Sequence, residues 1–464
     1  MSVAPVIPPE QLKTIAQEFL GFTAADTASI TIHHVAIGMA RVALGRVRMQ
    51  DNGDQLELSL MTQFGQRAQV GLEISQVDTT SLRNAAAYLD RAARELSGNP
   101  TRVGMPVPPR TYLPNTTWRE GTAVAFAGAR HAAVPALIEP TLDAGIMASA
   151  FVGVYAHSTA FANKTGILAT GQETDAELVV TGWTADGKGA GWAGQAAREW
   201  HALDPAAVAA RAIELTRRSA NAVAFEPGRH TAILDRPAVA QIVHGMGWAF
   251  DAQRTLAGRT PLYNPQTQRP RFGERIMDPR IVLRSDPSDR DGGMLPFNGK
   301  GYPILPMTWV DHGVHTNLGF RHDFAASVGY APANDPPNAL RLERTRGGGP
   351  ETVEEMIAAC ADGIYVNRFS YVGSAGDDPT VAMMSGATSG GCFLVRNGKL
   401  DKPIKNLRFL ESPWLFLNRL DAIGTSERAA FGYAPWAGRW PIDPTIVPPL
   451  MIRDFNFVAL ADSV

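Results

Sequence analysis

The stretch from Arg236 to Pro279 constrains the fold of this chain more than any other. Its first half follows the pattern of a long helix. Pro237 comes just after Asp235 and suits a first helical turn, because its missing N–H would have no partner there. Apolar residues then recur at steps of three and four, namely Val239, Ile242, Val243, Met246 and Phe250. The pattern predicts one long helix that packs a single apolar face against a core.

His244 and Trp248 lie one helical turn apart beside this apolar face. Some metallopeptidases bind zinc through two His at this spacing, with a Glu after the first as general base. Here Gly245 follows His244, and neither Trp248 nor Ala249 can be the second ligand. Two interpretations of His244 stay open: a structural, hydrogen-bonded histidine or a residue of a substrate chamber.

Charge and hydropathy exclude several classes of protein. The chain has 43 basic and 45 acidic residues, a formal net charge of −2, so it lacks the general attraction that nucleic-acid binders use. No run of eighteen apolar residues suggests a membrane span, and residues 1–11 lack the basic and apolar regions of a signal peptide. We expect no nucleic-acid partner, no membrane association and a cytoplasmic location.

Metal-ligating residue types are sparse. The two cysteines, Cys360 and Cys392, are too few for a disulfide framework or a zinc cage without His, and both are expected to be buried thiols. One His-rich cluster stands out, made of Asp311, His312, His315, His322 and Asp323. These side chains could bind a metal ion if a hairpin brought them together, although exposed turn histidines are the plainer interpretation.

Alternating helical and strand patterns predict an α+β protein. Helices are expected at 9–19, 81–96 with Ser81 as cap, 131–151 interrupted at Pro135 and Pro140, 205–223, 351–361 and 412–424. Strands are expected at 54–60, 230–235, 280–286, 364–373, 392–400 and 450–460, with a meander over 152–194 and a hairpin turn at Asp311–Gly313. The length of 464 residues allows two domains, and turn residues near Glu226 place them at 1–226 and 227–464.

Several longer segments carry a family resemblance. In chain order they are AHSTAFANKTG from Ala156, EPGRHTAILDRPAVAQIV, GRTPLYNP, FGERIMDPRIVLRSDP, LPFNGKGYP, GGCFLVRNGKL, PIKNLRFLESP and LDAIG. With these segments in this order, the chain resembles the TldD/PmbA proteins, described as modulators of DNA gyrase and as a bacterial peptidase pair. It is most similar to their TldE (PmbA) branch.

The resemblance has consequences for metal binding. TldD carries an HExxxH helix and a later Cys as zinc ligands, whereas TldE keeps the fold without them. At the first His, the Glu and the second His of this motif, the chain has His244, Gly245 and Ala249. The segment Gly432–Gly438, where the Cys would fall, has no Cys. The resemblance therefore implies no metal site in this chain and zinc in a TldD-type partner. It also implies an N-terminal antiparallel sheet flanked by helices and a C-terminal barrel-like β domain.

The function implied by the resemblance is that of a catalytically silent subunit. It would form a heterodimer with a TldD-like HExxxH subunit and shape a closed chamber for proteolysis of unfolded or modified peptides. The substrate-binding candidates are His244, Trp248, Glu274 and Arg275. Arg275 could hold a peptide carboxylate through two parallel hydrogen bonds, although a salt bridge between loop and sheet is the plainer interpretation of Glu274 and Arg275.

Two other functions stay open at this point. The chain could be a self-associating binding protein without a hydrolytic partner, since homodimers are the commonest oligomers. It could also be an independent hydrolase with an atypical site built on His312, His315 and His322. Neither composition nor motif spacing separates these alternatives from the heterodimer.

Overall fold

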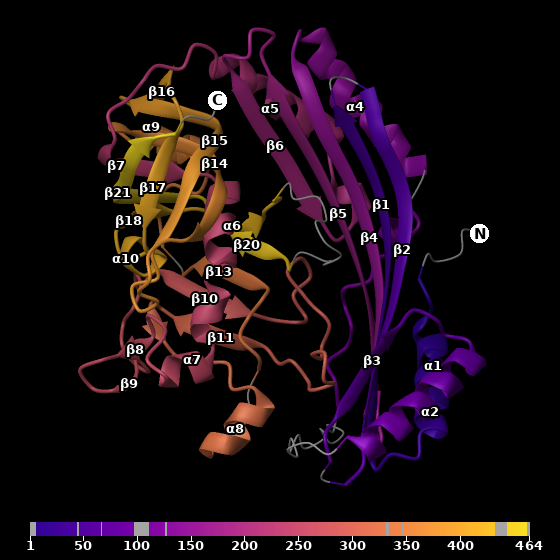
Figure 1. The fold of residues 1–464 in the computed structure, drawn as a ribbon. Helices are drawn as coiled ribbons and strands as arrows, with labels where there is room; N and C mark the ends of the chain where they lie inside the picture. The colour runs from indigo at the N-terminus through magenta and orange to yellow at the C-terminus, as the bar shows by residue number, and fades with distance from the viewer. Residues whose placement is uncertain are drawn as a thin grey trace.

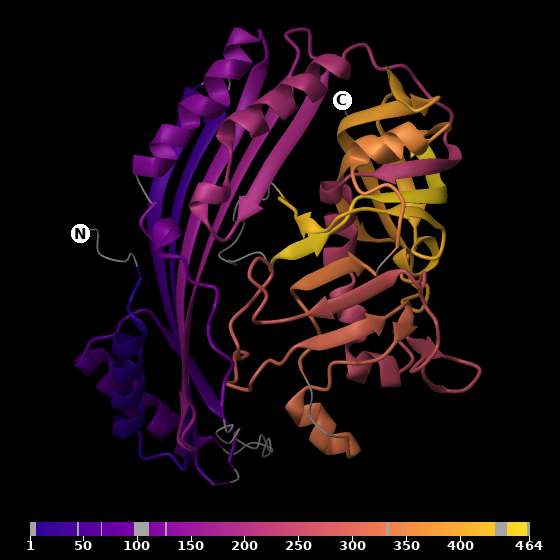
Figure 2. The ribbon, with the colours of Figure 1, turned by 180° about the vertical axis from the view of Figure 1, so that it is seen from behind.

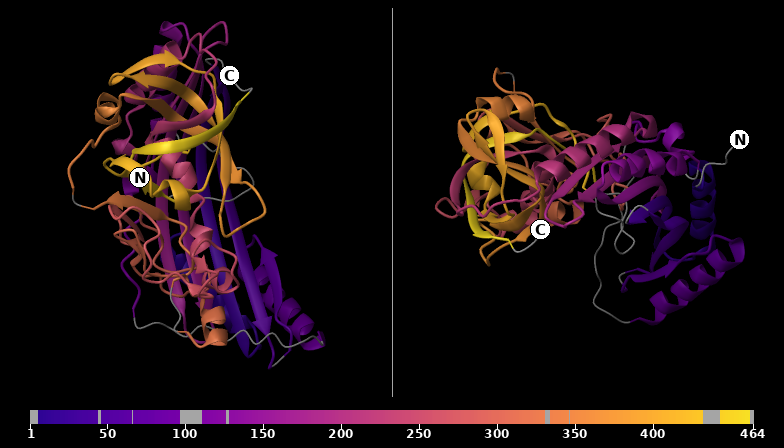
Figure 3. Two further views of the ribbon diagram at one scale, coloured as in Figure 1. Left: turned by 90° about the vertical axis from the view of Figure 1, so that its left-hand side faces the viewer. Right: turned by 90° about the horizontal axis from the view of Figure 1, so that it is seen from above.

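The chain forms two lobes that stand side by side (Figure 1), and the view from above separates them clearly (Figure 3). The computed structural model describes residues 6–43, 46–65, 67–96, 111–125, 128–330, 334–345, 347–431 and 443–461. Within these ranges, no helix is both long and apolar enough to cross a membrane.

The first lobe is built on one antiparallel sheet of six strands in the order β3-β2-β1-β4-β5-β6. Its strands are long, because β1, β2, β4 and β5 each have sixteen residues or more. The strands are β1 (Thr27–Ala43), β2 (Arg46–Gln63), β3 (Val70–Ile74), β4 (Met147–Asn163), β5 (Leu168–Trp183) and β6 (Ala190–Ala197). The predicted antiparallel sheet is confirmed.

The two faces of this sheet have different neighbours, because successive side chains of a strand point to opposite sides. Even-numbered residues such as Ile30 and Val152 pack against helices in two apolar clusters. Figure 2 shows α4 and α5 lying over this face. Odd-numbered residues of β4 face the second lobe, where Tyr155 packs with Ala430 and Phe161 with Phe297.

The helices of the first lobe cover its sheet, and two differ from prediction. They are α1 (Pro9–Phe22), α2 (Thr79–Glu95), α3 (Glu120–Ala123), α4 (Gly128–Asp143), the 3₁₀ helix Trp200–Ala202 and α5 (Pro205–Arg218). Asp78, not Ser81, caps α2, because its side chain accepts a hydrogen bond from the Ser81 N–H. Helix α4 continues through Pro135 and Pro140 and ends at Asp143, so the helix predicted over 131–151 is wrong from residue 147 on, where β4 begins. Buried residues of α4 pack on the sheet, and this packing outweighs the hydrogen bonds that proline removes.

The second lobe contains a closed five-stranded barrel in the order β14-β7-β21-β17-β15, and the pairing of β14 with β15 closes it. These strands are β7 (Gly228–Leu234), β14 (Asp362–Ser374), β15 (Met384–Arg396), β17 (Leu407–Glu411) and β21 (Leu450–Leu460). Two further strands, β16 (Lys399–Pro403) and β18 (Leu420–Ile423), pair with β15 and β21. The barrel confirms the expected C-terminal fold. The predicted boundary between residues 226 and 227 falls between α5 and β7 and stays a prediction.

A second six-stranded sheet, in the order β12-β11-β10-β13-β20-β19, completes this lobe. Its strands are β10 (Ile281–Ser285), β11 (Met307–Asp311), β12 (Val314–His315), β13 (Leu340–Arg344), β19 (Glu427–Arg428) and β20 (Thr445–Val447). The pair β8 (Tyr263–Asn264) and β9 (Arg269–Pro270) is separate. The remaining helices are α6 (Arg236–His244), the 3₁₀ helix Gly247–Phe250 (η2), α7 (Ala252–Leu256), α8 (His322–Val328), α9 (Val353–Ala359) and α10 (Pro413–Phe416).

Helix α6 is shorter and more deeply buried than predicted. The long helix expected from Arg236 onward ends at His244, and η2 follows after Gly245 and Met246. A side chain at Gly247 would place its Cβ only 2.1 Å from the Pro337 carbonyl oxygen, so the chain turns here in close contact with a neighbouring segment. All six residues from Ala238 to Val243 are buried, so the helix has no solvent-facing side along this length.

The helix predicted at 412–424 is wrong beyond its first turn. Only Pro413–Phe416 is helical, and Leu420–Ile423 forms β18, which pairs with β21 through Leu420 and Ile452. Backbone pairing with a neighbouring strand outweighs the helical pattern of this segment. Asn397 and Gly398 form the turn between β15 and β16, and both have positive φ, at 49° and 74°.

Candidate functional site

His244 ends helix α6 at a place where the second lobe approaches the first. Its ring contacts Phe431 edge-on, with centroids 5.3 Å apart, and its Nδ1 lies 3.5 Å from the Thr445 hydroxyl. The side chain is accessible to water, yet protein surrounds it densely enough that desolvation lowers its pKa. At neutral pH His244 is therefore an uncharged imidazole that can both donate and accept a hydrogen bond.

A short segment connects His244 to the sheet of the first lobe. The Phe431 backbone N–H donates to the Glu177 carboxylate on β5 at 2.7 Å, and Arg428 forms an ion pair with Asp175. Both Arg428 and Asp175 are nearly buried, so this ion pair lies between the lobes and not at the surface. Phe431 therefore contacts both His244 and Glu177 on β5.

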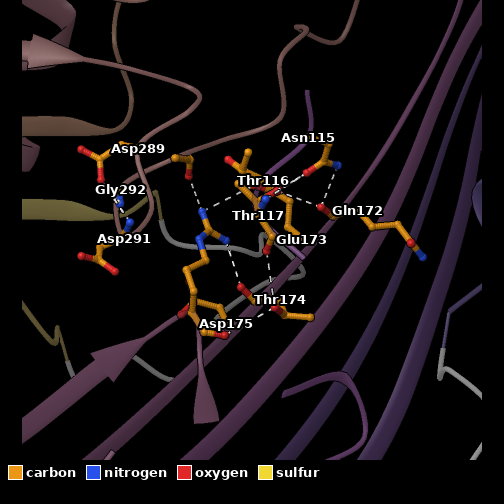
Figure 4. Close-up of polar contacts among 12 residues, drawn as sticks. Asn115, Thr116, Thr117, Gln172, Glu173, Thr174, Asp175, Asp289, Asp291 and Gly292 are labelled. Atoms are coloured by element: carbon orange, nitrogen blue, oxygen red, sulfur yellow. Dashed lines mark hydrogen bonds and ion pairs between the residues drawn. The ribbon is translucent and has the colours of Figure 1, made fainter. Parts of the chain in front are cut away.

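Arg198, just beyond the end of β6, makes a second polar connection between the lobes. It is 3% exposed, and its guanidinium donates to the Thr174 carbonyl at 3.0 Å and to the Gly293 carbonyl. It also lies 3.6 Å from the Glu173 carboxylate. Figure 4 shows the segments that meet here, with Gln172–Asp175 from the first lobe and the turn carrying Asp289, Asp291 and Gly292 from the second.

Burial shifts the pKa of several groups at this interface toward the uncharged form. The pKa of Glu173 is raised by burial, although Arg198 opposes the shift, and the pKa of Asp443 is raised to about 7 by burial and by Glu173. His157 pairs with Glu173 across β4 and β5, and burial, Arg198 and His33 lower its pKa to about 3. Its Nε2 has no hydrogen-bond partner among the described residues. His157 is therefore neutral over the physiological range.

His157 should make stability depend on pH. Its folded pKa of about 3 lies below the unfolded value of about 6.5, so between these values the unfolded chain binds a proton that the folded chain does not. Its contribution is fully present above the unfolded pKa and is lost as the pH falls. We expect native protein to lose about 2 kcal/mol more stability than His157→Gln between about pH 7 and pH 4.5, measured by urea unfolding.

The comparison of variants is necessary because other groups act in the opposite direction. The raised pKa values of Glu173 and Asp443 favour the folded state as the pH falls, but both groups are present in native protein and variant alike. Substitution of the exposed His131 to Gln serves as the control and should reproduce the native curve. Parallel curves for native protein and His157→Gln would show that His157 is not buried as a neutral group.

Comparison with known proteins identifies the family. The PmbA/TldA metallopeptidase C-terminal domain matches residues 227–459, which is half of the 464 residues. The chain belongs to the PmbA/TldD family. A protein of Archaeoglobus fulgidus named "Metalloprotease" is 23% identical over 250 residues, covering 52% of this chain. The match spans little more than half of that relative, 56% of its length.

Solved structures show that the PmbA/TldD fold extends over the whole chain. TldE from Thermococcus kodakarensis is similar with a TM-score of 0.78 and 15% identity, covering 96% of this chain and 99% of that one. A candidate modulator of DNA gyrase from Bacteroides thetaiotaomicron is similar with a TM-score of 0.79 and 17% identity, covering 97% and 99%. At these identities the likeness establishes the fold.

Two positions of the HExxxH motif carried by TldD hold neither a base nor a ligand side chain in this chain. Gly245 supplies no side chain beside His244, and Ala249 is fully buried in the main core of the second lobe, so this position does not face a site. The described residues contain no group of three His, Cys, Asp or Glu that could hold a metal ion. Residues 432–438, where the family's Cys would fall, lie outside the described residues.

The other three predicted site residues, Trp248, Glu274 and Arg275, have different contacts from those of His244. Trp248 borders a cavity of about 840 Å³ together with Arg254, whose guanidinium is 6.0 Å from the Trp248 ring. Glu274 forms an ion pair at 2.7 Å with Arg271, three residues earlier in the same loop, and not with Arg275.

Two further contacts fix the loop around Glu274. Its carboxylate accepts a hydrogen bond from Asn264, which lowers its pKa together with Arg271, and Arg275 forms a β-bridge with Val314. These contacts hold the loop against β12. The substrate-binding roles of Trp248, Glu274 and Arg275 stay predictions.

The His-rich hairpin is formed as predicted, but its histidines have separate surroundings. His312 contacts Asp311 at 2.8 Å, His315 contacts the Asn317 carbonyl at 3.0 Å, and His322 stacks on Tyr302. Sequence reasoning missed Arg198, Glu173 and His157, which occupy the interface between the lobes. No local motif marks them, because β-strand pairing and contacts between the lobes bring them together.

Proposed function

We propose that this chain is the zinc-free subunit of a TldD/TldE-type heterodimeric peptidase. The observation that supports this most directly is the end of α6. The imidazole of the motif is kept as His244, while Gly245 replaces the general base and the second-ligand position is a core alanine, Ala249. A hydrolytic zinc needs at least three protein ligands and an open position for water, and this helix offers one imidazole.

In the proposed complex the TldD-like partner supplies the zinc ion, its ligands and the general base. This chain contributes part of the chamber wall through the water-accessible, uncharged His244. The substrates are unfolded or modified peptides, whose extended backbone can be bound by strand addition with weak sequence preference. Enclosure between two subunits would admit such chains and exclude folded proteins.

Co-expression with a chain that carries an intact HExxxH helix tests the proposal. We expect the two chains to elute together, with about one zinc per complex, and this chain purified alone to contain no stoichiometric zinc. As a control, replacing both histidines of the partner's motif with Ala should remove zinc and leave the complex intact. Stoichiometric zinc in the isolated chain, or a lone homodimer that ignores the partner, would refute the proposal.

A further inference from the structure

A cavity of about 470 Å³ lies where the chain passes from the first lobe to the second. The first lobe contributes Lys188, from the turn between β5 and β6, and Asn221, which follows α5. The second lobe contributes the β15 glycines Gly390 and Gly391, and Lys405 from the connection between β16 and β17. A ligand in this cavity would therefore contact both lobes.

Backbone hydrogen bonds tie the segment after α5 to the second lobe beside the cavity. The Val223 N–H donates to the Pro403 carbonyl at 3.0 Å, and the Lys405 N–H donates to the Val223 carbonyl at 2.9 Å. These bonds join the connecting segment to the second lobe. Asn221, two residues earlier, has a φ of 60°, a conformation that Asn tolerates better than most residues.

The charged lining of the cavity is entirely cationic among the described residues. Lys188 and Lys405 border it, and no Asp or Glu of the described lining does. The carboxylate of Asp186 lies 4.0 Å from the Lys188 ammonium and already accepts hydrogen bonds from Thr184 and the Lys188 N–H. Both ammonium groups are exposed, so neither is fully neutralised by the protein.

The wall formed by β15 has an unusual backbone. Gly390 and Gly391 have φ values of 65° and 126° and form a bulge opposite β14, where the strand register shifts. A Cβ at Gly390 would lie 2.5 Å from the Trp192 Cβ, so the strand requires glycine here. A bulge turns peptide groups out of the strand ladder, and consecutive turned peptides are a common anion-binding arrangement.

The remaining lining combines two polar residues, Ser219 and Asn406, with aliphatic ones. Ala222, Ile404 and Leu460 supply aliphatic surface. Cys392 also borders the cavity, but burial raises the pKa of its thiol to about 12, so the thiolate needed for nucleophilic attack is absent at neutral pH. The cavity is suited to reversible binding and not to covalent chemistry.

We propose that this cavity binds a small amphipathic anion with a carboxylate or phosphate head and a short apolar body. The head lies between Lys188 and Lys405, and the body lies against Ile404 and Leu460. Because the two lysines belong to different lobes, the bound anion fixes one lobe relative to the other. The inference does not depend on the proposed peptidase role.

Calorimetric titration of the full chain with hexanoate, hexyl phosphate, inorganic phosphate and hexanol tests the proposal. We expect one of the two hexyl anions to bind best and so to identify the head group, and hexanol to bind at least about tenfold more weakly. Lys188→Met and Lys405→Met should each weaken binding about tenfold, while Lys402→Met, an exposed lysine on the adjoining strand β16, should not.

A cavity-filling variant separates this site from general attraction to a basic surface. Ala222→Phe keeps both lysines but fills the apolar part, so it should abolish binding of the hexyl anion and leave any weak binding of inorganic phosphate. Equal binding by Lys402→Met and Lys405→Met variants, equal affinity for hexanol, or no binding of either hexyl anion at millimolar concentration would overturn the proposal.

Discussion

Replacing Arg198 with Met is expected to lower the free energy of unfolding by about 3–5 kcal/mol, as measured by urea unfolding. The side chain is nearly inaccessible and donates to the carbonyls of Thr174 and Gly293, so its loss leaves both acceptors buried without a donor. It also removes the only cation within ion-pair distance of Glu173 among the described residues.

Arg453→Met provides the matched control. Arg453 is 58% exposed and forms a single surface ion pair with Asp421 at 3.1 Å, so its substitution should cost about 1 kcal/mol or less. Arg198→Lys should fall between native protein and Arg198→Met, because one ammonium cannot reach both carbonyls in the geometry of a guanidinium. A cost for Arg198→Met no greater than that of the control would show that the contact between the lobes does not depend on this residue.

Gly247→Ala is expected to destabilise the protein by about 3 kcal/mol, the upper part of the range for overpacking. The added Cβ would lie 2.1 Å from the Pro337 carbonyl oxygen, and a backbone atom cannot move away as a flexible side chain can. Because Gly247 begins η2, the backbone shift should also displace the end of α6 and His244. Thermal unfolding and near-ultraviolet circular dichroism would measure both effects.

Gly245→Ala is the control for this substitution. Its Cβ would meet the terminal methyl of Met384 at 3.0 Å, and this methyl can rotate away. Neither glycine has a positive φ, so the two variants differ in neighbours and not in backbone strain. We expect Gly245→Ala to cost about 1 kcal/mol or less. Equal costs at the two positions would contradict the close contact with Pro337.

Strands and turns with local signals are predictable from this sequence. Leu58 and Leu60 alternate with polar residues and are buried in β2, and the strand predicted at 450–460 coincides with β21. The same alternation is present in 27–43, where Ile30 and Ile32 are buried, so β1 is within reach of sequence reasoning although no strand is predicted there. Alternation of apolar and polar residues identifies a strand because the whole pattern lies within one segment of the sequence.

Features that depend on distant partners are not predictable in this way. The pattern of 412–424 is helical, but β21 recruits Leu420–Ile423 into a strand, and the close approach of Pro337 to Gly247 accompanies the early end of α6. The candidate site shows the same limit. His244 can be identified from the helical pattern around it. Arg198 cannot, because it donates to a carbonyl that is 95 residues away in the chain.

The family resemblance supplies what local patterns cannot. The five-stranded barrel is closed by the pairing of β14 and β15 and contains the parallel pair β7 and β14, whose partners Ala232 and Ile364 are 132 residues apart. No alternation within either strand specifies that neighbour. The residue types at Gly245 and Ala249, by contrast, are read directly from the sequence, and the burial of Ala249 explains why a ligand cannot face a site from that position.

Peptidase activity of the separate and combined chains is the most direct test of a silent subunit. With unfolded casein fragments as substrate, we predict no hydrolysis by this chain alone and zinc-dependent hydrolysis when an HExxxH-bearing partner is added. Replacing the motif Glu of the partner with Gln should abolish the activity. His244→Ala in this chain should leave the partner's zinc in place. Hydrolysis by the isolated chain, lost on chelation and restored by zinc, would contradict the account.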